Sequence, residues 1–392
     1  MNLKNLSSAQ KKIFGQDVFL RLDLNVPMLG KKIKDDFKIK QSLESIKFLL
    51  NNDCRLIIAS HLGQPEGAYK AQFSLAPVAK QLETLLDGPV KFLPFTKYSK
   101  FSDIRQELKK DKKNRIFVLD NVRFFSGEER NCKRLGKSFA SLAQVYVNDA
   151  FAVSHRAHSS VSAIKNFLPS YAGLLLQKEI DNLNKIIKPE KPLAAIIGGA
   201  KISTKVPLIN KIYPATAQVL VAGALANNFF KAQGFNIGQS LFSEKESELA
   251  KKYLKMNKII LPIDVVVKSE LKNKKSSVSV KKLSEVADND NILDIGPKTI
   301  ALFSKYISQA KTIVWNGPLG MFEKKDFAKG SLAIAKKVAQ QSSAKKAFSV
   351  VGGGETNELL HLSGVSKKIN WVSTGGGAML SYLAGEDLPA LQ

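Results

Sequence analysis

Polar and cationic side chains follow four short apolar runs in the first half of the chain. Asp23 and Asn25 lie in VFLRLDLNV (18–26), and the other three runs are RLIIAS (55–60), RIFVLD (115–120) and QVYVNDAF (144–151). The side chains that accompany those three runs are Ser60, His61, Asn121, Arg123, Asn148, Asp149, His155, Arg156 and His158. Guanidinium groups pair with phosphate or carboxylate at two points, so this surplus of cations predicts a site for a small polyanion.

Each of these features also has a plainer interpretation. For the first run alone, a partly exposed polar face or a loop cap explains Asp23 and Asn25 equally well. His155 and His158 are equally consistent with a role in holding their loop together. No nucleophile, base and orienting acid occur at a spacing that predicts a catalytic triad.

Four apolar runs in the second half end in glycines that are expected to open helices. They are IIGGAKISTK, LVAGALANNF, VVGGGETNELL and VSTGGGAMLSYL. Glycine lets the backbone approach a ligand, and a helix N-terminus offers free N–H groups to phosphate. One such turn would fit an ordinary tight turn, but four, with Lys201 and Lys205 near the first, predict phosphate binding. Neither GxxxxGK[ST] nor GxGxxG occurs, which disfavours a Walker-type site and a standard dinucleotide site.

A polyanion site in one half and a phosphate site in the other predict phosphoryl transfer across a cleft between two domains. That reaction needs positioning, charge neutralisation and exclusion of water, with little covalent work by the protein.

The elements that position these residues alternate between short apolar runs and longer amphipathic stretches, which predicts an α/β fold with parallel sheets. In VFLRLDLNV, Val18 and Leu20 fall on one strand face while Phe19 and Arg21 fall on the other. The expected strands of the second half are PLAAIIGG, AQVLVAG, KIILPIDVVV, KTIVWNG, AFSVVGGG and INWVSTGGG. A long amphipathic helix predicts a domain boundary between residues 168 and 190, and LKNKKSSVSVKK predicts a solvated hairpin.

Length and composition agree with this organisation. A chain of 392 residues, 44% hydrophobic and 24% charged, is long enough for two domains. Cys54 and Cys132 are too few for a disulfide framework, and no apolar run predicts a leader or a membrane span, so a cytoplasmic protein is expected. The net charge is +26, yet all eight arginines lie at or before Arg156, so the excess is a diffuse lysine enrichment. We therefore expect no membrane partner and no dedicated nucleic-acid role.

From residue 18 to the C-terminus, a series of longer motifs follows in order. They include LRLDLNVP, SHLGQPEG, LDNVRFFSGEE, VNDAFAVSHRAHSS, GGAKISTK, IVWNGPLGMFE, VVGGGETN and STGGGAML. In these motifs the chain resembles the phosphoglycerate kinases. The resemblance implies two Rossmann-like domains joined by a hinge helix, and reversible phosphoryl transfer from 1,3-bisphosphoglycerate to Mg-ADP in glycolysis and gluconeogenesis. It implies a monomer whose phosphoglycerate-binding domain is 1–172, whose nucleotide-binding domain is 173–377, and whose tail, about 378–392, packs back onto the first domain.

The resemblance also implies roles for particular residues. The phosphoglycerate site would be Asp23, Asn25, Lys38, His61, Arg123 and Arg156. The nucleotide site would be Gly199, Lys201, Lys205, Gly223, Leu241, Gly296, Asn316, Pro318, Met321, Glu323, Gly352, Gly353, Gly354, Glu355 and Thr356. Lys38, Lys201 and Gly376 would be catalytic, with Gly375 and Gly377 in the same turn, and Glu355 would approach Mg²⁺.

Several positions depart from the family pattern. Lys38 replaces an arginine, Gln64 replaces another, and Glu355 replaces an aspartate; Ala152 and Ala224 replace glycines, and Ser381 replaces a glutamate. Loss of the guanidinium fork would slow transfer about tenfold to a thousandfold if about 1.4 to 4 kcal/mol of stabilisation disappears. In a chain so rich in lysine, an equally good interpretation is that Lys38 is an adapted replacement that does the work of the arginine. The alternative function is a catalytically weak relative that binds anions, including nucleic acid, through its positive charge.

Overall fold

The computed structural model describes residues 3–270 and 276–392 of the chain. They form two compact units, Met1–Ile180 with Asp387–Gln392 and Asp181–Glu386. The division therefore lies inside helix α6 (Leu174–Ile187), and the segment that returns to the first unit begins at Asp387. The sequence analysis placed the end of the first domain at residue 172 and the end of the second at residue 377. The substrate expected for each unit stays a prediction.

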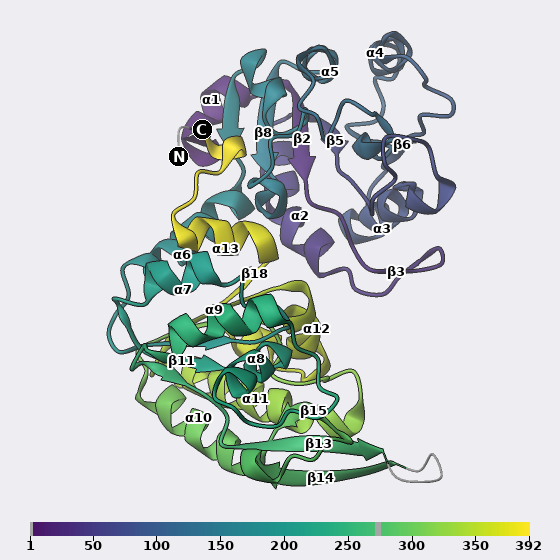
Figure 1. The fold of residues 1–392 in the computed structure, drawn as a ribbon. Coiled ribbons are helices and arrows are strands. Elements are labelled where there is room, and N and C mark those ends of the chain that lie inside the picture. The colour runs from purple at the N-terminus through teal and green to yellow at the C-terminus, as the bar shows by residue number, and fades with distance from the viewer. Residues whose placement is uncertain (1–2, 271–275) are drawn as a thin grey trace. The chain divides into compact units, whose positions relative to one another are not determined.

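The first unit is built on a parallel sheet of seven strands (Figure 1). Across the sheet the strands are β1 (Lys4–Asn5), β9 (Ser170–Ala172), β8 (Val145–Asp149), β2 (Asp17–Leu22), β5 (Arg55–Ala59), β7 (Ile116–Leu119) and β6 (Lys91–Leu93). The helices are α1 (Gln10–Ile13), α2 (Phe37–Asn51), α3 (Ala76–Leu86), α4 (Phe101–Lys110) and α5 (Lys133–Ala140). The pair β3 (Met28–Leu29) and β4 (Lys32–Ile33) is antiparallel.

Both faces of this sheet are covered. Val18 and Leu20 of β2 pack in one apolar cluster with residues of α2 and α3. Phe19, on the opposite face, packs in a second cluster with residues of α4 and α5. The predicted alternation along β2 is therefore confirmed, and burial on both sides holds the strand ends in place.

The second unit contains a parallel sheet of six strands and a separate sheet of three (Figure 1). The first has the order β12 (Ile259–Ile260), β11 (Thr216–Val221), β10 (Leu193–Ile197), β16 (Thr312–Asn316), β17 (Phe348–Gly352) and β18 (Trp371–Ser373). The second is antiparallel, with the order β14 (Ser276–Lys282), β13 (Asp264–Glu270) and β15 (Asp290–Ile295). The helices are α7 (Val206–Ile212), α8 (Ala224–Ala232), α9 (Glu244–Leu254), α10 (Pro297–Gln309), α11 (Lys329–Ser343), α12 (Gly354–Leu362) and α13 (Gly376–Ala384).

The expectation of a single strand over residues 258–267 is wrong. Pro262 cannot donate to a ladder, and the chain leaves the parallel sheet after β12 to start β13 in the antiparallel sheet. Asp264 then serves another purpose, because its carboxylate accepts the backbone N–H groups of Lys298 at 2.9 Å and Thr299 at 2.7 Å in the first turn of α10. The predicted hairpin corresponds to β13 and β14, while its turn lies outside the described residues.

Candidate active site

The carboxyl ends of β8, β2, β5 and β7 lie side by side, because these strands are neighbours in one parallel sheet. Hydrogen bonds join the loops that follow them. Gly63 N donates to Asn25 Oδ1 at 3.0 Å, and Arg123 Nη1 donates to the Gly63 carbonyl at 2.9 Å. The backbone N–H of Leu24 donates to Ser60 Oγ at 2.8 Å. The structure thus brings Asn25 and Arg123 together although 97 residues separate them in the sequence.

Lys38 lies in the first turn of α2 and forms an ion pair with Asp23. Lys38 Nζ is 2.6 Å from Asp23 Oδ2, and the two side chains are 27% and 6% exposed. An ammonium group has three donors, so the pairing leaves Lys38 able to donate to a ligand as well. A carboxylate at the rim therefore fixes the position of this amine.

His61 is a neutral ring. It is 4% exposed, and burial, followed by the positive charges of Arg21 and Arg123, holds its pKa well below the ordinary value. Arg21 Nη2 lies 3.3 Å from His61 Nδ1. Since guanidinium can only donate, Nδ1 accepts, and the proton of the ring is on Nε2. His61 is thus available as a hydrogen-bond donor without adding charge.

A buried network supports this rim from below. Arg21 Nε donates to Ser160 Oγ at 2.8 Å, and Ser160 Oγ donates to Glu128 Oε1 at 2.6 Å. The Ser160 backbone N–H donates to Glu128 Oε2 at 3.0 Å. Sequence reasoning missed Arg21 and Glu128 as parts of the site. The alternation of VFLRLDLNV places Arg21 on the same strand face as Asp23 and Asn25, and this pattern could have identified Arg21 as part of the site. The sequence around Glu128 contains no comparable pattern.

Two predicted rim residues lie within the sheet instead. Asn148 and Asp149 are fully buried in β8. Asn148 Oδ1 accepts from Ala150 N at 3.1 Å, and Asp149 Oδ1 accepts from Leu176 N at 2.9 Å. Burial raises the pKa of Asp149 to about 6. Both side chains therefore organise the chain after β8, including the first turn of α6.

The remaining polar residues after β8 differ in exposure. Arg156 is exposed, and its Nε donates to His155 Nε2 at 3.2 Å. His158 is buried, and burial, aided by Arg123, lowers its pKa to about 3. His158 is therefore neutral, which leaves Arg156 and Arg123 as the cations of this part of the rim.

Three of the four glycine turns open helices in the second unit, as expected. Gly223, Gly353 and Gly375 are the N-caps of α8, α12 and α13. The expectation for the first turn is wrong, because a loop separates the end of β10 at Ile197 from the start of α7 at Val206. Backbone bonds hold that loop: Gly198 N donates to Asn316 O at 2.9 Å and Gly199 N to Pro318 O at 3.0 Å.

A cavity of about 490 Å³ lies between this loop and the starts of α12 and α13. Its lining includes Lys201, Lys205, Asn316, Gly353, Gly354, Glu355, Thr356, Gly376 and Gly377. A Cβ atom on Gly376 would lie 3.2 Å from Gly353 Cα, so two helix N-termini adjoin the same cavity. Free N–H groups and the positive ends of two helices suit an anion there.

Lys205 is partly buried at the floor of this cavity. Its Nζ donates to Asn316 Oδ1, while Asn316 Nδ2 donates to the Gly352 carbonyl at 2.7 Å. Burial lowers the pKa of Lys205 to about 8, although the charge of Glu355 opposes the shift. The amine is therefore held in one place and poised to gain a proton beside a negative ligand.

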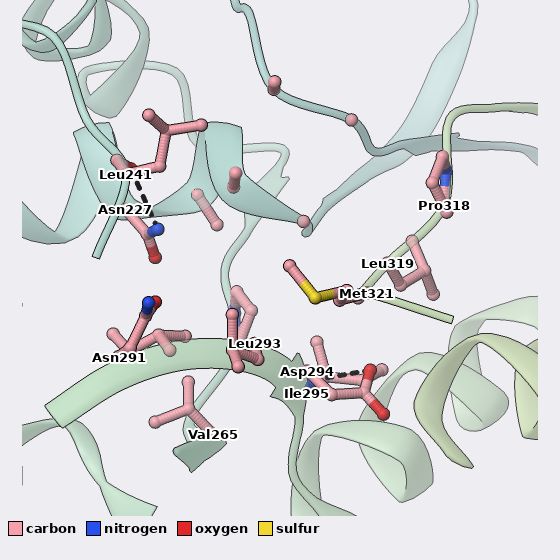
Figure 2. A pocket seen from close by; sticks show the side chains of 18 of the residues that line it. Asn227, Leu241, Val265, Asn291, Leu293, Asp294, Ile295, Pro318, Leu319 and Met321 are labelled. Atoms are coloured by element: carbon pink, nitrogen blue, oxygen red, sulfur yellow. Dashed lines mark hydrogen bonds between the residues drawn. The ribbon is translucent and has the colours of Figure 1, made fainter. Parts of the chain in front are cut away.

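A second cavity, of about 390 Å³, shares Gly199, Ala200 and Glu355 with the first (Figure 2). Its lining is mainly apolar. The residues that line it include five of those predicted from the sequence: Gly223, Leu241, Pro318, Met321 and Glu323. Four polar residues, which the sequence analysis missed, also line it: Asn227, Gln239, Asn291 and Asp294. An apolar cavity next to an anion site fits a flat base with phosphates attached.

Two predicted residues, Gly296 and Gly352, line neither cavity. A Cβ on Gly296 would lie 2.3 Å from the Asp264 carboxylate carbon, and one on Gly352 would lie 2.4 Å from Met379 Sδ. Close packing accounts for both glycines.

The residues present suit a magnesium ion that arrives with the phosphates. Within 3–270 and 276–392, no group of three or more His, Cys, Asp or Glu side chains could hold a metal ion. Glu355 is exposed in the first turn of α12 and lines both cavities. Mg²⁺ is commonly bound by one or two carboxylates together with substrate phosphates and water, and Glu355 could supply one such ligand.

Comparison with known proteins identifies the family. The family model described as "Phosphoglycerate kinase" matches residues 9–386. The chain belongs to this family. A phosphoglycerate kinase of Thermosipho africanus is 40% identical over 96% of this chain and 94% of its own length, and one of Finegoldia magna is 41% identical over 99% and 97%.

Solved structures agree with this assignment. The phosphoglycerate kinase of Coxiella burnetii matches with a TM-score of 0.80 and 36% identity over 100% of this chain and 96% of its own. That of Pyrococcus horikoshii matches with a TM-score of 0.85 and 29% identity over 99% and 98%. The chain is thus a phosphoglycerate kinase of glycolysis, a phosphotransferase with a carboxyl acceptor that uses small-molecule substrates and a nucleotide co-substrate. No helix among the described residues is long and apolar enough to span a membrane.

Proposed function

We propose that the rim of the first unit binds 3-phosphoglycerate or 1,3-bisphosphoglycerate and that the two cavities of the second unit bind Mg-ADP or Mg-ATP. The observation that carries the nucleotide assignment is the paired cavity. One part has two helix N-termini, Lys201, Lys205 and a single carboxylate, and the adjoining part is apolar. Phosphates suit the first part and a nucleobase suits the second.

In this proposal the transfer is direct. Lys201 contacts the transferring phosphoryl group, Lys205 binds the nucleotide phosphates, and the N–H groups of Gly376 and Gly377 face the developing charge. Glu355 would hold Mg²⁺ together with the phosphates, and the bound ion would supply neutralisation of their charge. Hinge motion at α6 is expected to accompany the reaction, and the protein is expected to act as a cytoplasmic monomer without nucleic acid.

In the first unit, Arg123 and Arg156 bind the phosphate and carboxylate ends of the acid, with His61 donating from Nε2. Asp23 and Asn25 accept from the hydroxyl group, and Lys38, held by Asp23, neutralises charge on the acyl phosphate. Lysine is a point charge where arginine would make a two-point contact.

The test is turnover of 3-phosphoglycerate with Mg-ATP, coupled to NADH oxidation through a dehydrogenase. Lys201→Ala should lower kcat by at least about a hundredfold, since it removes a cation that acts on the transition state. The matched control is Lys305→Ala, an exposed lysine of α10, which should keep wild-type turnover. Unchanged kcat in Lys201→Ala would refute its role, and absence of turnover in the wild type would refute the proposal.

A further inference from the structure

Arg123, one of the cations of the rim, has a carboxylate beside it. Its Nε lies 3.1 Å from Glu129 Oε1, and the two side chains are 4% and 48% exposed. An ion pair that is open to solvent on one side adds little to the stability of a protein. A carboxylate next to a group that is expected to bind an anion should instead affect the ligand.

Other groups orient the guanidinium of Arg123. Its Nη1 donates to the Gly63 carbonyl at 2.9 Å, and its backbone N–H donates to Asn121 Oδ1 at 3.0 Å. Its Nε has no hydrogen-bond partner among the described residues, although the oxygen of Glu129 is close. Glu129 therefore acts on Arg123 mainly through its charge.

The charges around Arg123 have opposing effects. Burial lowers the pKa of the Arg123 guanidinium, and among its charged neighbours Glu129 has the largest effect, which raises that pKa. Arg156 and Arg21 lower it. An anion bound to Arg123 would be attracted by the two other arginines and repelled by Glu129.

The backbone next to Glu129 is held by hydrogen bonds. Glu128 N donates to the Phe125 carbonyl at 3.0 Å, and the Glu128 carbonyl accepts from Ser159 N at 2.9 Å. The Glu128 side chain is buried and bonded to Ser160. The exposed side chain of Glu129 can change its rotamer, but its negative charge stays near the rim.

We propose that Glu129 lowers the affinity of the rim for the phosphorylated acid by offsetting the charge of Arg123. This inference rests on the proposed function, which places the acid at Arg123. Phosphoglycerate carries a phosphate and a carboxylate, and a nearby negative charge repels both groups. The repulsion acts on the ground state and on the transition state alike, so Glu129 sets KM rather than kcat.

Calorimetric titration of the full chain with 3-phosphoglycerate tests the inference. Glu129→Gln removes the charge but keeps an oxygen on a side chain of the same length, and it should bind 3-phosphoglycerate at least about threefold more tightly than the wild type. The gain should shrink when the salt concentration is raised from about 0.05 M to about 0.5 M, because the carboxylate is exposed and is screened by salt.

Turnover supplies a second measurement. In Glu129→Gln the KM for 3-phosphoglycerate should decrease by at least about threefold, while kcat does not rise and the KM for Mg-ATP changes by less than about twofold. Damage to the rim would weaken binding, so a gain in affinity cannot come from a purely structural role of Glu129.

Two further variants are the matched controls. Glu83→Gln, at an exposed position of α3, changes the net charge of the first unit by the same amount and should keep the wild-type affinity. Glu129→Asp keeps the charge on a shorter side chain and should bind 3-phosphoglycerate within about twofold of the wild type.

Two results would overturn the inference while leaving the proposed function intact. One is an affinity of Glu129→Gln for 3-phosphoglycerate that is equal to or lower than that of the wild type. The other is an equal gain in Glu83→Gln, which would assign the effect to net charge alone. Failure of the wild type to bind 3-phosphoglycerate would overturn both the inference and the proposed function.

Discussion

Binding of nucleotide phosphates beside Lys205 should be accompanied by uptake of a proton. Burial lowers the pKa of this amine to about 8 in the free protein. A phosphate at the adjoining helix N-termini would favour the charged form and return the pKa toward its ordinary value of about 10.4. The lysine is then partly neutral before binding and charged afterwards, and the difference comes from solution.

The pKa values set the size of this effect. Uptake at Lys205 should be about 0.1 proton per nucleotide near pH 7, about 0.5 near pH 8 and about 0.9 near pH 9. The charged amine binds phosphate, so affinity is highest below the lowered pKa and declines as pH rises through it. Between pH 7 and pH 9 the affinity for Mg-ADP should decrease about tenfold.

Calorimetry in buffers of different ionisation enthalpy measures the uptake directly. Lys205→Gln keeps a donor for Asn316 but cannot be protonated, and it should remove most of the uptake and the decline in affinity. Lys305→Gln, at an exposed position of α10, should change neither. Uptake that is absent near pH 8 to 9, or unchanged in Lys205→Gln, would refute the reasoning.

Two further variants test what holds each unit together, by urea unfolding. Glu128→Gln should lower the free energy of unfolding by about 3 to 5 kcal/mol, since it removes the buried charge that faces Arg21. The control is Glu129→Gln at an exposed position, and an equal loss of stability in the two variants would contradict this prediction. Gly198→Ala should also destabilise, by more than about 2 kcal/mol, because its Cβ would lie 2.1 Å from the Pro318 carbonyl oxygen. Gly88→Ala, whose Cβ meets nothing closer than 3.8 Å, is the control, and equal midpoints for these two would count against the packing argument.

The parts of the fold that depend on local periodicity were predictable from the sequence. Val18, Phe19 and Leu20 alternate between two apolar clusters as their spacing requires. Glycines that end a buried strand and open a helix were also recognisable at Gly223, Gly353 and Gly375. At Gly223 and Gly353 the positive φ of 73° and 110° favours glycine over other residues.

What could not be predicted depends on contacts between distant segments. Residues 258–267 read as one strand, and only the pairing partners of β12 and β13 reveal two sheets. Burial likewise decided that Asp149 caps the start of α6 rather than facing a ligand. Asn227 escaped notice because an asparagine in a helix is unremarkable until its unpaired oxygen is seen to face a cavity.

The segment Asp387–Gln392 belongs to the first unit, where Ala390 N donates to the Ser154 carbonyl at 3.2 Å and Lys165 Nζ to the Pro389 carbonyl at 2.9 Å. During translation, therefore, the portion of the polypeptide that emerges first acquires its last native contacts only after the whole intervening unit has left the ribosome. The second unit, Asp181–Glu386, is a continuous segment, so all of its native contacts can form as soon as its own residues have been synthesised. Order of synthesis and order of completion are thus reversed in this protein.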